Sequence, residues 1–488
     1  MKRSRDSWLT FFANLMRAGN GRPVALAVLL TLSFINLCSE WPHDVARPAL
    51  VDKLYALMPD SFGTTRQLLF DHYQRLFPRI PAAQPVTIVE IDDRTLAAVG
   101  QWPWPRNRLA TLLDDIAAHK PLAIGLDFYM PEVDQTSPGK VADNLPATSA
   151  DLAAGLRALP SHEAVLAASL RAAPSVLGAA AIDHAAPDAS LDLRSAPILV
   201  HGANPLATVQ RYLYVLASLP ELQAAARGQA LLNVTLEQGT IRRMPMIVGL
   251  GDKLVPSLPI EMLRVATGSP AVDVFADKSG VRAVGVADVE VPTEPDGDFR
   301  LDFASVRLTG SRNVSARDVL DGRVDAERFR NKLVLVGLTG TGLTDMRTTA
   351  LGELVPGVEV QAQAIEAIFE GRFLRRPTWL IRAERAFIMM FGILIIWYLP
   401  HPNTRFAAFV RSVPKAGFAI MGISLNLLTL LMCFLLFKYF RLLVDAAAIF
   451  IILSAVVGCF FSAALLDYGV QSRRTARRAR AREDNEFR

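Results

Sequence analysis

The chain has 488 residues, of which 51% are hydrophobic and 20% charged, and its formal net charge is +5. A mean hydropathy of +0.27 predicts membrane-spanning segments beside a water-soluble part. All three cysteines lie in apolar runs, which excludes a disulfide-stapled fold and zinc sites of the Cys-x-x-Cys type.

The N-terminal region combines a basic start with an apolar run. Residues 1–23 carry five cations, and residues 24–38 read VALAVLLTLSFINLC. This run is shorter than the roughly 17 residues of the shortest spans, so flanking residues have to lengthen it. A cleaved signal peptide fits the same pattern, but no Ala-x-Ala site follows. We therefore predict that residues 1–23 are cytoplasmic and that 24–38 form an uncleaved transmembrane helix.

The large region that follows has the pattern of an α/β domain. Residues 39–85 have helical periodicity and are predicted to form a connector. Within 86–382, apolar runs typical of buried strands alternate with helical patterns, which favours a mostly parallel sheet covered by helices. The predicted strands are 86–91, 122–128, 175–180, 231–236, 244–250, 281–286 and 333–338. The predicted helices are 107–119, 151–159, 163–172, 259–267 and 358–370. Turn-rich residues 280–303 indicate an antiparallel addition, whereas 134–150 and 182–193 are predicted loops.

Two of the predicted strands end in aspartates. Asp92 and Asp93 follow the first strand, and Asp127 follows the second. If these strands are neighbours, their carboxylates meet at the carboxyl edge of the sheet, where open parallel sheets bind ligands. They could then hold a cation or a polar ligand. The alternative is that they cap helices and hold turns, a role favoured for Asp93, which precedes a short helix.

The segment GQWPWPR, residues 100–106, precedes the helix that starts near residue 107. Its two prolines fix their own φ angles and push the preceding tryptophans toward extended conformations. One indole can close the core under the sheet, while the other, with Arg106, could face a cleft or a neighbouring subunit. Trp102, Trp104 and Arg106 are therefore candidate interface residues. Trp104 and Arg106 are also candidate ligand contacts.

A glycine-rich segment, LVLVGLTGTGLTDMRTT, leads from the strand at 333–338 to Asp345. Backbone N–H groups after such a strand can bind an anion. However, the P-loop Lys-Ser/Thr and the G-x-G-x-x-G register are both missing, so a structural loop is favoured. Asp345 joins Asp92 and Asp127 as a candidate ligand-binding residue. Arg242 and Arg243 follow a turn and are expected to form ion pairs, which could include the strand-end aspartates.

Three more apolar runs, at residues 386–399, 416–437 and 442–466, predict three further transmembrane helices. Four spans put both termini on one side, and the arginine-rich tail at 467–488 marks that side as cytoplasmic. The large α/β region is then extracytoplasmic. The tail fits anionic membrane lipids better than nucleic acid.

Three blocks of the chain together resemble the type-two CHASE domain, the cyclase- and histidine-kinase-associated sensory extracellular domain. They are residues 86–132, 231–264 and 331–376, and the resemblance covers roughly 45–377 together with one span before the domain and three after it. It implies a bacterial inner-membrane sensor with a periplasmic domain. Its signature positions here are Asp92, Trp102, Pro103, Trp104, Pro105, Arg106, Asp127, Gly337, Asp345, Pro356 and Gly357. Unlike usual members, this chain carries no fused output domain, so we expect a separate effector.

No catalytic constellation emerges, because Gly-x-Ser-x-Gly and His-Glu-x-x-His are absent and the histidines are scattered. We therefore expect no enzyme and no cofactor, and no metal is assigned. The first expectation is a sensor that binds a signal outside and acts on a separate cytoplasmic cyclase or kinase. Its other partners would be membrane lipids and further copies of itself, not nucleic acid. The alternative is a structural or assembly subunit of an envelope complex.

Overall fold

The computed structural model describes residues 21–41, 48–56, 61–343, 346–398, 415–460 and 462. The chain divides into two compact units. We call Met1–Trp41, Val45–Tyr73 and Arg375–Arg488 the helical unit, and Pro42–Asp44 and Gln74–Leu374 the α/β unit. Each is described by itself.

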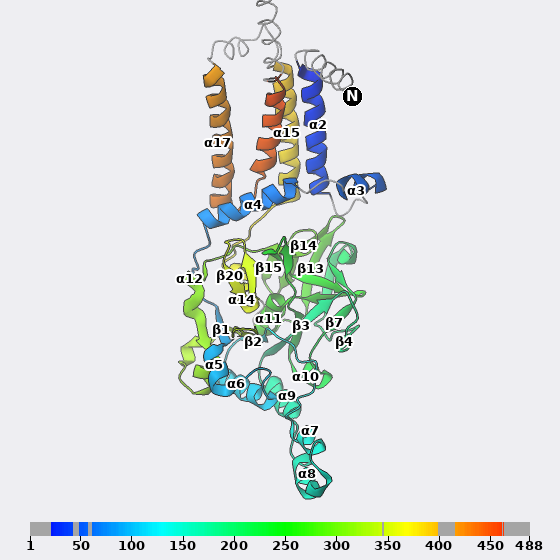
Figure 1. Ribbon diagram of the computed structural model, residues 1–488, viewed down its shortest axis with the longest axis vertical. Coiled ribbons are helices and arrows are strands. Elements are labelled where there is room, and N and C mark those ends of the chain that lie inside the picture. The colour runs from blue at the N-terminus through cyan, green and yellow to red at the C-terminus, as the bar shows by residue number, and fades with distance from the viewer. Residues whose placement is uncertain are drawn as a thin grey trace, which may run out of the picture. The chain divides into compact units, whose positions relative to one another are not determined.

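The α/β unit is built on one large sheet (Figure 1). Its strands run in the order β17-β1-β18-β2-β3-β7-β4, and β8 also pairs with β3. All pairs from β17 to β3, and β3 with β8, are parallel, whereas β7 is antiparallel to β3 and β4. The strands are β1 (Val86–Ile91), β2 (Ala123–Leu126), β3 (Ser175–Ile182), β4 (Ala189–Ser190), β7 (Tyr214–Leu216), β8 (Gly228–Leu231), β17 (Asn313–Ser315) and β18 (Leu333–Leu338). The predicted mixed α/β fold with a mostly parallel sheet is confirmed.

Helices cover both faces of this sheet because its strands are apolar on both sides. Val89 and Ile91 of β1 join a core with α6 and α9, whereas Val86 and Ile88 join a second core with α11 and α14. Burial on both faces is what a continuous apolar run in a parallel strand requires. The first face carries α5 (Asp93–Val99), α6 (Arg106–Ala118), α9 (His162–Ala172), α10 (Pro220–Ala225) and α13 (Ala316–Leu320). The second carries α11 (Leu258–Thr267) and α14 (Gly357–Phe369).

Smaller sheets follow the middle of the chain. One has the order β15-β14-β13-β5, antiparallel except for the parallel pair β13–β5, and it contains the predicted antiparallel addition. Its strands are β5 (Ile198–Gly202), β13 (Val272–Asp277), β14 (Gly280–Val286) and β15 (Val289–Pro292). The remaining strands are β6 (Arg211–Tyr212), β9 (Thr235–Glu237), β10 (Thr240–Pro245), β11 (Ile247–Leu250), β12 (Lys253–Pro256), β16 (Asp298–Arg300), β19 (Met346–Thr349) and β20 (Leu354–Pro356).

Both segments predicted as loops contain regular structure. Residues 134–150 include α7 (Pro138–Asp143) and the 3-10 helix η2 (Ala147–Ser149), which lead into α8 (Ala150–Arg157). Pro138 at the first helical position is compatible with a helix start, so proline is not a breaker there. Residues 182–193 include the short strand β4.

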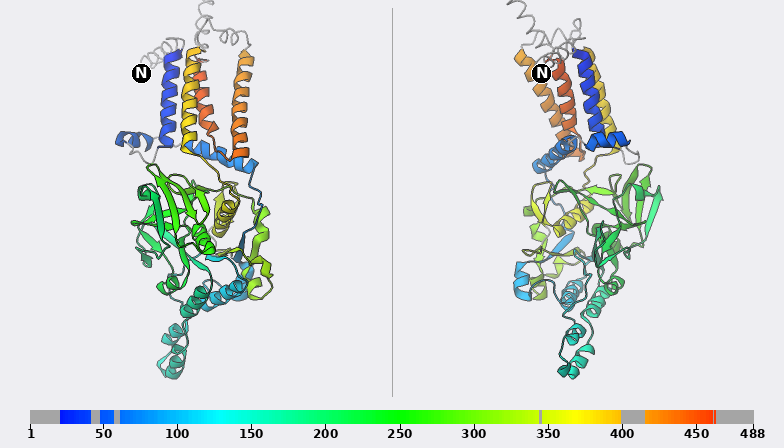
Figure 2. Two further views of the ribbon diagram at one scale, coloured as in Figure 1. Left: turned by 180° about the vertical axis from the view of Figure 1, so that it is seen from behind. Right: turned by 45° about the vertical axis from the view of Figure 1, so that its right-hand side comes forward.

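The helical unit contains helices over each predicted apolar run (Figure 2). They are α2 (Arg22–Ser39), α3 (Ala49–Ala56), α4 (Ser61–Leu76, which ends in the α/β unit), α15 (Thr378–Tyr398), α17 (Lys415–Phe440) and the helix Ala446–Phe460. Helices α2 and α15 pack closely, since a Cβ on Gly392 would lie 2.6 Å from Leu29 Cδ1. Among the described residues, only α2 is both long and apolar enough to cross a membrane.

Candidate functional site

The aspartate after β1, Asp92, is occupied by local hydrogen bonds. It is the N-cap of α5, and its carboxylate accepts from the Thr95 backbone N–H at 2.8 Å and from the Ser315 hydroxyl at 2.9 Å. The Thr95 hydroxyl donates to the same oxygen. Such a cap stabilises a helix by about 1 kcal/mol. The cap is thus Asp92 and not Asp93, because α5 already begins at Asp93.

Asp93 instead holds the glycine-rich segment after β18. Its carboxylate accepts from the Thr341 backbone N–H at 2.7 Å and from the Thr341 hydroxyl at 2.8 Å. Gly340 donates to the Ile91 carbonyl at 3.0 Å, and a Cβ there would lie 2.5 Å from Leu96 Cδ1. This close packing supports the structural reading of the segment. Asp345 lies outside the described residues.

Asp127 lies against the start of α14. It follows β2, is half-buried, and its backbone N–H donates to the Val336 carbonyl at 2.9 Å. A Cβ on Gly357, the first residue of α14, would lie 3.7 Å from Asp127 Oδ2. A carboxylate at this place interacts favourably with the positive end of the helix dipole.

The strands that precede Asp92 and Asp127 are not neighbours, contrary to the sequence expectation. Strand β18 lies between β1 and β2 and pairs with both. Consecutive strands in the chain need not be adjacent in the sheet, and each pairing adds about 4.8 Å. The two aspartates therefore lie on either side of β18, and no shared carboxylate pair forms at this edge.

The Trp-Pro-Trp-Pro segment turns one indole into the core. Trp104 is 2% exposed, and its Nε1 donates to the Gly100 carbonyl at 2.8 Å. Trp102 is half-buried, with its ring centroid 5.0 Å from that of Phe128 in an edge contact. Residues 101–103 form a bend, not an extended segment, because this hydrogen bond ties Trp104 back to Gly100; the Trp102–Pro103 peptide bond is cis. Trp102 is therefore the indole with more surface left for another molecule.

Arg106 begins α6 beside a buried polar cluster. Its backbone N–H donates to Asp134 Oδ2 at 2.7 Å, which supplies the cap that Pro105 cannot make. The same oxygen lies 3.0 Å from His162 Nδ1, and the Asp134 N–H donates to Glu163 Oε1 at 2.6 Å. Burial lowers the pKa of the Arg106 guanidinium, and the carboxylates of Asp134, Glu163 and Glu132 oppose that shift.

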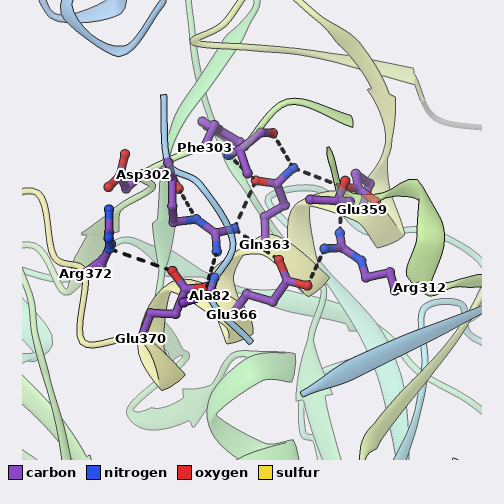
Figure 3. Close-up of polar contacts among 12 residues, drawn as sticks. Ala82, Asp302, Phe303, Arg312, Glu359, Gln363, Glu366, Glu370 and Arg372 are labelled. Atoms are coloured by element: carbon purple, nitrogen blue, oxygen red, sulfur yellow. Dashed lines mark hydrogen bonds and ion pairs between the residues drawn. The ribbon is translucent and has the colours of Figure 1, made fainter. Parts of the chain in front are cut away.

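A second buried network, which the sequence did not predict, lies along one face of α14 (Figure 3). The side chains of Glu359, Gln363 and Glu366 project from successive turns of the helix. Glu366 forms ion pairs with two arginines. Arg79 Nη2 lies 3.1 Å from Glu366 Oε2, and Arg312 Nη2 lies 2.6 Å from Glu359 Oε1. Arg312 Nη1 also pairs with Glu366.

This network joins three distant parts of the chain. Arg79 also donates to the Asp302 carbonyl at 2.9 Å, and Gln363 accepts from the Ala304 N–H at 2.7 Å. Arg79 Nη1 also lies 3.3 Å from Glu370 Oε1. Arg79 and Arg312 are at most 1% exposed, so their charges are compensated by buried partners and not by solvent. Burial raises the pKa of Glu366, while Arg312 and Arg79 lower it. The sequence signal was the spacing of Glu359, Glu366 and Glu370, at i, i+7 and i+11, in and just after a helix whose other residues are apolar apart from two glutamines.

Arg243 forms ion pairs, as predicted, but with a carboxylate of β9 and with carboxylates of the loop between β15 and β16. Its guanidinium lies 2.7 Å from Glu237, and 2.9 Å from both Glu294 and Asp296. Within the described residues, no group of three or more His, Cys, Asp or Glu side chains is arranged to hold a metal ion.

The helical unit has its own buried ionic cluster. Arg376 lies 2.8 Å from Glu40, at the end of α2, and 2.9 Å from Glu384 of α15. Arg66 of α4 lies 2.9 Å from Glu40 and 3.5 Å from Asp445, next to the last helix. Although burial raises it, the pKa of Glu40 is lowered overall by its arginines, Arg376 first. The cluster ties four helical segments together.

A family model described as the CHASE2 domain matches residues 51–399. No curated protein and no solved structure matches the chain.

Proposed function

The chain belongs to the CHASE2 domain family, whose members are extracellular sensory domains of signalling proteins, and on that basis we propose a bacterial inner-membrane sensor. The α/β unit receives a periplasmic signal, and a separate cytoplasmic effector, a cyclase or a kinase, responds. The main observation in support of this proposal is the family match over residues 51–399, together with the apolar helix α2 that precedes it. The function requires no catalysis by the chain itself.

The proposed topology has four spans, formed by α2, α15, α17 and the helix Ala446–Phe460, with both termini in the cytoplasm. The arginine-rich tail supports that orientation. Glu384, in the second turn of α15, is compatible with a span because Arg376 pairs with it. Fusions of alkaline phosphatase and of a fluorescent protein after residues 150, 407 and 488 test it. Phosphatase activity is expected only at 150, and activity at 488 contradicts the topology.

A ligand would bind at the carboxyl edge of the sheet, where Asp127, half-buried beside α14, is the best-placed of the candidates. Asp92 is engaged by its cap, and Trp104 and Arg106 are buried. A thermal-shift screen of periplasmic solutes should find compounds that raise the unfolding temperature of the wild type but not that of the Asp127→Asn variant. Asp93→Asn serves as the matched control. A ligand whose stabilisation both variants retain places the site elsewhere.

A structural role in an envelope complex is the second candidate, and exposed apolar side chains on α8, such as Leu152, favour it. Purification from native membranes without cross-linking separates the two. A co-purifying cyclase or kinase supports sensing. A stoichiometric envelope complex without any signalling enzyme supports the structural role.

A further inference from the structure

The segment between β2 and α9 forms a helical arm. Helices α7 and α8 pack mainly on each other and project from the end of α9 (Figures 1 and 2). Ala142 of α7 and Ala153 of α8 are buried in that contact. Neither helix contributes a residue to the two cores that flank the large sheet. The arm therefore is not needed to complete the core of the α/β unit.

The outward side of α8 carries an apolar stripe. Leu152 is 58% exposed and Leu159, just after the helix, is 55% exposed. With Gly155 and Leu156 between them, they follow the i, i+3, i+4, i+7 pattern of a helix that packs on another helix. Leaving such leucines in water is unfavourable by about 25 cal/mol for each Å² of apolar surface. The stripe is thus suited to a second helix.

The charges on the arm indicate what that helix is. Within α7 and α8 themselves, the charges of Lys140, Asp143, Asp151 and Arg157 sum to zero, which disfavours a lipid surface or a charged polymer as the partner. Asp143 and Arg157 pair with each other at 2.9 Å. In the described part of the chain, Lys140 and Asp151 form no ion pair. An unpaired cation on α7 and an unpaired anion on α8 can be matched by the anion and the cation of a second copy, across a two-fold axis.

We propose that the α7–α8 arm is a homodimer contact, in which α8 of one copy packs on α8 of a second copy and Lys140 pairs with Asp151 across the axis. The contact is small, and anchoring both copies in one membrane raises their effective concentration. The gain in effective concentration rests on the proposed membrane location, whereas the self-complementarity of the stripe is independent of it.

Disulfide cross-linking of the full chain in membranes tests the proposal. The three native cysteines are at most 9% exposed, so they give a low background. Under mild oxidation, Gly155→Cys and Leu152→Cys should form dimers. Lys278→Cys, at an exposed turn between β13 and β14, is the matched control and should stay monomeric. Equal cross-linking at all three positions, or none at Gly155 and Leu152, overturns the proposal. Capture of a protein of a different mass also overturns it.

Charge reversal gives a second, independent readout. In the Gly155→Cys background, Lys140→Asp and Asp151→Lys should each lower the dimer yield roughly a few-fold, since an exposed pair contributes modestly. The double reversal should restore the yield. Failure to restore it contradicts the pairing, provided that circular dichroism shows unchanged folding. Because these measurements need no signal and no effector, their failure leaves the sensor function untouched.

Discussion

At the scale of residues, Trp104 shows how a signature position can serve the core. Its indole is 2% exposed and hydrogen-bonded to Gly100. We predict that Trp104→Ala destabilises the α/β unit by about 3–5 kcal/mol, the cost of truncating a buried aromatic side chain. Trp102→Ala should cost less. Denaturant unfolding of the detergent-solubilised protein measures both. A stable Trp104→Ala variant with altered oligomeric state would instead assign the residue to an interface.

Asp298 is the residue for which we predict a pH-dependent stability. Burial and then Asp296 raise its pKa to about 7, while Arg243 opposes them. Because the folded state holds this proton more tightly than the unfolded state, its contribution is greatest below about pH 4 and is lost as the pH rises to about 7.

The Asp298→Asn variant tests this sign. Relative to the wild type, it should gain stability as the pH rises through this window and change no further above it. Thermal unfolding between pH 4 and 8 measures the difference. Glu294, whose pKa is lowered to about 2 by Arg300 and Arg243 despite its burial, loses its contribution only on acidification below its usual pKa, so the two effects separate. A constant difference across the range contradicts the assignment.

At the scale of elements, α14 depends on its buried charges being matched. Removing one partner of a buried ion pair costs about 3–5 kcal/mol, because the other charge stays buried alone. We therefore predict a loss of that size for Arg312→Met. The double variant Arg312→Met with Glu359→Gln should recover part of it. Denaturant unfolding of the wild type and of the single and double variants gives the coupling free energy between Arg312 and Glu359. If the losses of unfolding free energy in the single variants simply add up in the double variant, the two residues act independently.

The sequence predicted the strands of the large sheet better than it predicted their order. β1 and β18 were predicted with their observed bounds, since local apolar runs set them. The order of strands was not predictable, because the insertion of β18 between β1 and β2 depends on a contact between residues more than 200 positions apart. For the same reason, the prediction that the carboxylates of Asp92 and Asp127 meet at the edge of the sheet was wrong, although each aspartate was correctly placed after its strand.

Buried arginines were the other feature that local patterns could not reveal. Arg79 and Arg312 look like ordinary surface residues in the sequence, and only the acids on one face of α14 hinted at buried partners. A charge is buried when a distant partner compensates it, and that partner is set by the tertiary fold. Function prediction from sequence therefore rested on the family resemblance, which the match over 51–399 confirms.

At the scale of the whole molecule, the two ionic networks belong to different units. The α14 network lies in the α/β unit, whereas Arg376, Glu40 and Glu384 lie in the helical unit. We predict that Arg376→Met weakens the helical unit selectively, by about 3–5 kcal/mol, because two buried carboxylates lose a partner. The matched control is Arg282→Met, since Arg282 forms an exposed pair with Asp277 and its loss should change stability by less than about 1 kcal/mol.

Hydrogen exchange followed by mass spectrometry can resolve this prediction by segment, because each peptide reports its own opening free energy. In Arg376→Met, peptides from α2, α4 and the start of α15 should exchange faster, since Glu40, Arg66 and Glu384 lie there. Peptides from β1, β18 and α14 should keep wild-type protection. Equal acceleration in both sets would mean that the units unfold as one, and the ionic cluster would then stabilise the whole chain and not the helical unit alone.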